Sequence, residues 1–192
     1  MTDQLQTYTE AFETACARAH RLADTLSDDA FNWKPAPKRW SVGECLVHLN
    51  TIAGRELPHF VAAAEAAEAA GRRGQGPFRY GLFSRLFIQS VTPGSRPLPT
   101  LPAMKPPPTP VPTRSNLDRD AVLAAMDAST EGFVMLIDRS GGLDLAGVKV
   151  ASPFLPFVSM PLGAHLEALG QHALRHVGQA ERVAAMPGFP RG

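Results

Sequence analysis

Apolar residues recur at intervals of three and four positions in four separate stretches of the chain, and this spacing predicts four amphipathic helices. The stretches cover about residues 3–26, 41–70, 115–140 and 159–183. Helices of this length joined by irregular connections predict an all-α protein, a four-helix bundle that occupies residues 1–192 as a single domain.

The second predicted helix has the clearest boundaries. Ser41 is followed three residues later by Glu44, which is the signature of a capping box at a helix N-terminus. Gly71 follows the last apolar position, as is common after a helix C-terminus. Ser27-Asp28-Asp29 interrupts the pattern after the first helix, and residues 31–37, which contain two prolines, predict an extended link without helix.

A long proline-rich crossover, residues 71–114, separates the second and third predicted helices. Nine of the eighteen prolines lie between positions 93 and 112, a density that excludes a regular helix or strand. The aromatic and apolar residues 78–88 predict a short helix before them. This crossover could cap a pocket or form a dimer interface, but the simpler interpretation is a strap over the outer face of the bundle.

Composition and charge exclude several classes of protein. The 192 residues are 44% hydrophobic and 19% charged, with a net charge of +1, so neither nucleic acid nor an anionic membrane is an expected partner. No apolar run is long enough to span a bilayer, and the N-terminus lacks the pattern of a signal peptide. Cys16 and Cys45 are expected to be reduced, buried thiols in a cytoplasmic protein.

Three histidines carry the candidate chemistry. His172 and His176 are one helical turn apart on the inner side of the fourth predicted helix, and His48 flanks the apolar stripe of the second. Two interpretations stay open at this point, a shared metal ion or hydrogen-bonded core histidines. Three histidines without a fourth protein ligand would describe a reactive metal site rather than a structural one.

Other polar residues are weaker candidates. Glu44 lies one turn before His48 and could orient it or act as a base, although capping already explains it, and Gln179 could line the mouth of a pocket. His165 is two turns from His172, about 10 Å, and is expected to pack or lie at the surface. His20 could reach the interior edge. No glycine-rich loop predicts a nucleotide or other organic cofactor.

Three short segments make the chain resemble the DinB-like superfamily, also called the YfiT-like metal-dependent hydrolases. Residues 31–49, with Asn32-Trp33-Lys34-Pro35 and the Trp40-to-Glu44 run before His48, resemble the N-terminal signature of that family. Residues 172–179 resemble its C-terminal signature, and residues 104–107 are similar to a crossover segment of one subgroup. The two signatures are fairly specific as a pair, and together the segments span most of the chain.

The resemblance implies an up-down-down-up four-helix bundle that is often dimeric. It also implies a divalent metal, usually zinc or nickel, held by three histidines, which here would be His48, His172 and His176. The name of the family reflects damage-inducible expression and does not imply DNA binding. Ala173 departs from related sequences, which often have a larger polar residue at that position.

Two functions therefore remain in competition. The first is a metal-dependent enzyme that acts on a small molecule, either as a hydrolase or as a transferase of a low-molecular-weight thiol, since some members of the family use such thiols. The second is a non-catalytic metal- or ligand-binding module of a stress response, which the lack of a clear carboxylate cluster favours. A bundle without metal, with structural histidines, is a third possibility.

Overall fold

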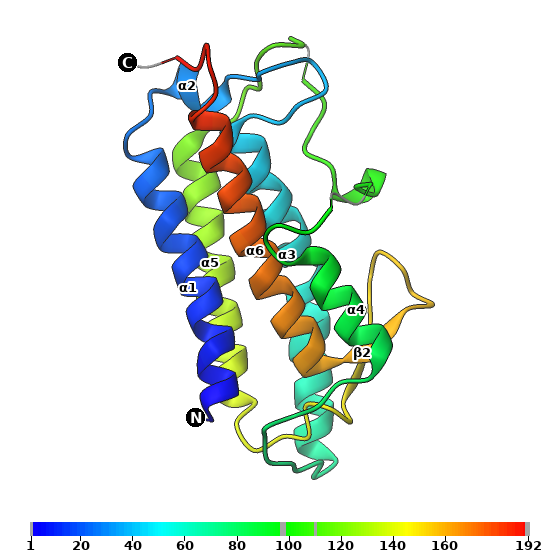
Figure 1. Cartoon of the computed structure of the whole chain (residues 1–192). Coiled ribbons are helices and arrows are strands. Elements are labelled where there is room, and N and C mark those ends of the chain that lie inside the picture. Colours follow the sequence, from blue (N-terminus) through cyan, green and yellow to red (C-terminus); the bar gives the residue numbers. More distant parts are fainter. Residues whose placement is uncertain (1, 97–98, 110, 191–192) are drawn as a thin grey trace.

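Four long helices make up about half of the computed structural model, which describes residues 2–96, 99–109 and 111–190 (Figure 1). They are α1 (Asp3–Ala23), α3 (Val42–Ala69), α5 (Arg119–Arg139) and α6 (Leu162–Ala184). The helices α1 and α3 each pack against both α5 and α6. Figure 1 shows α1 and α6 running in one direction and α3 and α5 in the other. The prediction of a mostly helical chain is confirmed.

The capping box predicted at the start of α3 is present. Ser41 Oγ accepts a hydrogen bond from the backbone N–H of Glu44 at 3.0 Å, and Glu44 Oε2 accepts one from the backbone N–H of Ser41 at 2.9 Å. The helix continues through Pro58, and Gly71 follows its end with φ of +64°. A positive φ is a conformation that glycine adopts without steric cost, so both ends of α3 are specified locally.

The predicted extended link between the first two long helices is wrong in its first part. It begins with a five-residue helix, α2 (Asp28–Asn32), whose N-cap is Ser27. Ser27 Oγ accepts a hydrogen bond from the backbone N–H of Ala30, and two aspartates follow in the first turn. The Ser-Asp-Asp sequence is therefore a helix start and not a break, because acidic residues favour the positive end of the helix dipole.

Polar side chains from three segments meet in a buried network beside the start of α3. Ser115 Oγ lies 2.8 Å from Ser41 Oγ and donates a hydrogen bond to Asn32 Oδ1 at 2.7 Å. Because Ser115 makes these contacts, it does not cap the third long helix, which was predicted to start at residue 115 or 116. The helix α5 starts instead at Arg119, with Asp118 as its N-cap.

A small antiparallel hairpin interrupts the otherwise helical chain before α6. Its strands are β1 (Lys149–Ala151) and β2 (Ser159–Pro161), and Val150 is paired with Met160. In the sequence, residues 143–160 form a connection in which Val148 and Val150 alternate only briefly before Pro153 and Pro156. The strand forms because its partner lies ten positions further on, which is a contact that local periodicity does not reveal.

The crossover lies mainly against α6 and α3. Its short helix, α4 (Leu82–Val91), packs on α6, and a 3-10 turn, η1 (Pro102–Met104), contacts α3. Ile88 and Val91 are buried, whereas Leu82, Phe83 and Leu86 on the other side of α4 are exposed. The predicted short helix is therefore confirmed, a few residues later than its predicted position at 78–88.

Two buried apolar clusters fill the space between the long helices. One includes Phe31, Leu46 and Val177, and the other includes Phe60 and Leu166. Within the residues described, the apolar side chains of each helix are too few and too dispersed for it to cross a membrane.

The first cluster leaves no room for a side chain at Gly43 of α3. A methyl group there would come within 2.5 Å of the Phe31 ring, whereas one at Gly54 of the same helix would meet nothing within 4 Å. We expect Gly43→Ala to lower the free energy of unfolding by about 1–3 kcal/mol through overpacking. Gly54→Ala should raise it by about 0.5–1 kcal/mol through helix propensity. Urea denaturation measures both, and an unchanged stability for Gly43→Ala would contradict the tight contact.

Candidate functional site

The structure brings His48, His172 and His176 together between α3 and α6. The nearest ring nitrogens, His48 Nε2 and His172 Nε2, are 3.1 Å apart, and ligand atoms of all three residues lie within 4.8 Å of one another. The His172 and His176 ring centroids are 4.4 Å apart because residues four positions apart share one face of a helix. Imidazoles from distant parts of the sequence thus converge as the motif spacing predicts.

The crossover contacts this cluster through a backbone carbonyl. His48 Nδ1 lies 2.6 Å from the carbonyl oxygen of Met104, and since a carbonyl can only accept, Nδ1 must carry the proton. The lone pair of His48 is then on Nε2, the nitrogen that faces His172. Backbone carbonyls commonly fix the tautomer of metal-binding histidines in this way, by accepting a hydrogen bond from the ring nitrogen that does not face the metal. The interpretation of the crossover as a mere outer strap does not account for this contact.

Burial keeps the three imidazoles neutral. The pKa of His172 is lowered to about 3 and that of His176 to about 2, in each case mainly by burial and further by the neighbouring histidines. The pKa of His48 is also lowered by burial, against the opposing effect of its bond to Met104. The Trp40 ring covers one side of the cluster, with its centroid 4.9 Å from that of His48. At neutral pH all three side chains therefore retain a lone pair.

The cluster fits a divalent metal ion by two observations. The Nδ1 atoms of His172 and His176 are buried without a hydrogen-bond partner in the described structure, so hydrogen bonds do not satisfy both ring nitrogens of either residue. Two nitrogens on one tetrahedral zinc ion lie about 3.3 Å apart for bonds of about 2.0–2.1 Å, close to the 3.1 Å that separates His48 Nε2 and His172 Nε2.

Glu44 lies one turn from His48, but both of its oxygens are occupied. Lys34 Nζ contacts Oε1 at 2.8 Å, and the backbone N–H of Ser41 contacts Oε2 at 2.9 Å. The pair of Lys34 and Glu44 is almost fully buried. Gln179 is half-buried one turn beyond Arg175, and its side chain favours the protonated form of His176 against the effect of burial on that pKa.

The remaining histidines lie elsewhere. His165 is buried, and its Nε2 is 3.1 Å from the carbonyl oxygen of Val150, so of its two predicted positions it takes the packed one. His59 is exposed. His20 faces Asp127 of α5 and not the three-histidine cluster.

Sequence reasoning missed two contributors to the polar interior. The Met104 carbonyl is a backbone group with no signature of its own, and only the similarity of residues 104–107 to a family segment pointed to it. Glu56 is buried two turns beyond His48, where Ser152 Oγ donates to it at 3.1 Å, and burial raises its pKa to about 7. Glu56 does not belong to the group formed by the three histidines, whose ligand atoms lie within 4.8 Å of one another.

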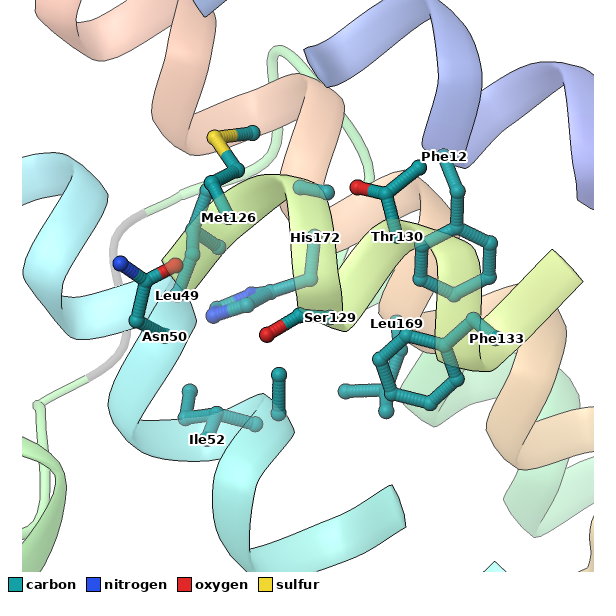
Figure 2. Close-up of a pocket in the computed structure, with 12 residues that line it drawn as sticks. Phe12, Leu49, Asn50, Ile52, Met126, Ser129, Thr130, Phe133, Leu169 and His172 are labelled. Carbon is teal, nitrogen blue, oxygen red and sulfur yellow. The ribbon is translucent and has the colours of Figure 1, made fainter. Parts of the chain in front are cut away.

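A small cavity borders the cluster on the inner side of His172 (Figure 2). Its volume is about 40 Å³, which is room for only about one to three water molecules. Side chains from α1, α3, α5 and α6 form its mostly apolar wall, and His172 projects among them (Figure 2). A larger hollow, formed by Thr2, Phe78, Gly142 and their neighbours, lies at the other end of the bundle, far from the histidines.

The cluster's electrostatic surroundings are positive. The guanidinium of Arg175, between His172 and His176 in sequence, contributes to the lowered pKa of both histidines. Arg175 also binds the crossover, because its Nη1 donates to the carbonyl oxygen of Ser90 at 2.8 Å and to the hydroxyl of Ser95. A positive charge at this position favours an anionic ligand at the cluster.

Comparison with known proteins gives one match. A family model described as the DinB superfamily matches residues 11–180, which include the three histidines and Met104. No curated protein and no solved structure matches the chain significantly.

The lowered histidine pKa values predict an acid-sensitive protein when metal is removed. Between the ordinary pKa of 6.5 and the folded values near 3 and 2, the unfolded chain binds more protons than the folded chain. The free energy of unfolding should therefore fall as the pH is lowered from about 6.5, by up to about 1.4 kcal/mol per pH unit for each histidine. Urea denaturation of chelator-treated protein at a series of pH values measures this slope.

The variant His172→Gln should show a shallower slope, while His59→Gln, at an exposed position, should keep the slope of the wild type. Glu56, whose pKa is raised, makes the free energy of unfolding increase as the pH is lowered. This contribution is the same in the wild type and in both variants. Equal slopes for the wild type and His172→Gln would contradict the burial of a neutral imidazole.

Proposed function

The chain belongs to the DinB superfamily, and from that premise we propose that His48, His172 and His176 bind one divalent metal ion. The observation that carries this proposal is the convergence of their ligand atoms within 4.8 Å, with a tautomer of His48 that presents Nε2. Neutral imidazoles are suitable ligands for zinc and for nickel, the two metals that the resemblance implies.

The function that this site supports best is that of an enzyme that transfers a low-molecular-weight thiol to a small molecule. A bound divalent ion supplies Lewis acidity, which favours the thiolate form of a thiol at neutral pH. Hydrolysis would also need a general base, and among the described residues no carboxylate is grouped with the histidines. The charge of Arg175 further favours an anionic thiolate over neutral water.

The residues around the histidines have separate roles in this proposal. The Met104 carbonyl holds the His48 ring in one tautomer, and Trp40 excludes water from one side of the cluster. Glu44 acts on the position of His48 through the start of α3, and not as a base, because both of its oxygens have partners. Gln179 remains a candidate for contact with substrate at the edge of the site.

One observation favours the second candidate, a non-catalytic metal-binding module. The cavity beside His172 is too small for an organic substrate, which favours a site that binds a metal ion without turning over a substrate. A hydrolase is the third candidate, with water in place of the thiol.

Elemental analysis and a thiol-consumption assay test these alternatives together. We expect the wild type to hold one more metal ion per chain than His176→Ala, and to consume thiol with an electrophilic acceptor only when it is metal-loaded. His59→Ala, an exposed histidine on α3, is the matched control and should behave as the wild type. Equal metal content in the wild type and His176→Ala would refute the metal site. If the protein binds metal but turns over no thiol acceptor, ester or amide, the result would favour the non-catalytic metal-binding module.

We also propose that the four long helices form the up-down-down-up bundle of the family and that two chains associate through α4. The contacts and directions of the helices support the first statement. Leu82, Phe83 and Leu86 of α4 are 69%, 60% and 56% exposed, and such an apolar surface is typical of an interface. Both cysteines are free, which supports a reducing compartment such as the cytoplasm.

The dimer makes a simple prediction. Leu86→Glu should shift the protein from dimer to monomer in light-scattering measurements at micromolar concentration, because a charge would be buried at the interface. Met135→Glu, at a 65% exposed position on α5, is the matched control and should remain dimeric. A wild type that is monomeric, or a Leu86→Glu variant that stays dimeric, would contradict an interface on α4.

A further inference from the structure

We propose that Cys16, His20 and Asp127 form a second binding site for a divalent, thiophilic metal ion such as zinc. The three residues lie between α1 and α5, and none of them belongs to the three-histidine cluster. The proposal does not depend on the function of the first site.

The geometry brings three different ligand atoms to one point. Cys16 and His20 are one turn apart on α1, and Asp127 faces them from α5. Asp127 Oδ1 is 3.2 Å from Cys16 Sγ and 2.7 Å from His20 Nε2. All three ligand atoms lie within 4.8 Å of one another, so small shifts could place each of them on a common ion.

This site is distinct from the histidine cluster in position. The helices α1 and α5 pack against each other, as do α3 and α6, so the two groups occupy different helix–helix seams of the bundle. Asp127 is exposed, and Cys16 and His20 are half-buried. Solvent therefore reaches the group, and a hydrated ion has an open path to it.

The donor set points to a metal more than to catalysis by the cysteine. Thiolate, imidazole and carboxylate together are typical ligands of zinc, and three of them leave a position for water. A nucleophilic cysteine would need a lowered pKa, but burial and the hydrogen bond to Asp127 raise the pKa of Cys16 to about 11. An ion that binds here displaces the thiol proton to solvent, and the cation then neutralises both the thiolate and the carboxylate.

An ion pair between His20 and Asp127 does not by itself explain why the three side chains converge. Both side chains are substantially exposed, at 35% and 54%, and exposed ion pairs contribute little to stability. A metal ion that bridges α1 and α5 would instead raise the stability of the folded chain, because it binds only when both helices are in place.

Titration of the metal-free full-length protein with Co²⁺ tests the proposal. A thiolate-to-cobalt charge-transfer band is expected, because sulfur is a ligand in this site and is not one in the three-histidine cluster. Cys16→Ser should abolish the band, and Asp127→Asn should weaken Co²⁺ binding at the band by more than about tenfold. Asp127 is exposed, so its variant should fold even if Cys16→Ser does not. Cys45→Ser is the matched control: Cys45 is fully buried in the core, and the band should remain.

The outcomes separate this site from the first one. A band with one bound ion per chain in His176→Ala would support the second site whether or not the three histidines bind metal. The absence of a charge-transfer band in the folded wild type, or a band that survives in Cys16→Ser, would overturn the proposal. An unchanged Co²⁺ affinity in Asp127→Asn would remove Asp127 from the ligand set and overturn the site as proposed.

Discussion

The buried ion pair between Lys34 and Glu44 is the interaction on which the rest of the site depends. Their charged atoms are 2.8 Å apart with side chains only 8% and 4% exposed, and Glu44 also accepts the backbone N–H that begins α3. Loss of one partner of such a pair typically costs about 3–5 kcal/mol, because the other charge stays buried. The link after α2 is thereby fixed to the start of α3, one turn before His48.

The ion pair is connected to a hydrogen-bond network that fixes the C-terminal end of the crossover. Ser41 joins Glu44 to Ser115, and Ser115 joins both to Asn32. The chain that follows the proline-rich segment is thus held at the same end of the bundle as the start of α3. Because Arg175 holds the near end at Ser90, the strap must pass beside the histidines, and the Met104 carbonyl can reach His48.

Features specified by nearby residues could be predicted from the sequence, and features that depend on distant contacts could not. The capping box at Ser41 and the shared face of His172 and His176 follow from spacing within one helix turn. Ser115 is kept away from the start of α5 by Asn32 and Ser41, which are distant in sequence, and the hairpin at Val150 depends on a partner strand ten positions away. The apolar stripes left the position of His48 open, and only the family resemblance implied that it meets His172 and His176. Its tautomer depends on a carbonyl that no side-chain pattern encodes.

The same helical spacing occurs at both candidate metal sites, and burial makes their chemistry different. His172 and His176 are neutral far below neutral pH, so their lone pairs are available without loss of a proton. Cys16 keeps its proton above neutral pH, so binding at the seam of α1 and α5 must displace it. The bond between zinc and a thiolate is strong enough to offset the loss of the thiol proton, whereas a hard ion such as magnesium binds thiolate too weakly to do so. The buried seam is therefore suited to an ion that stays bound over a wide pH range, and the open seam to one whose occupancy rises with pH.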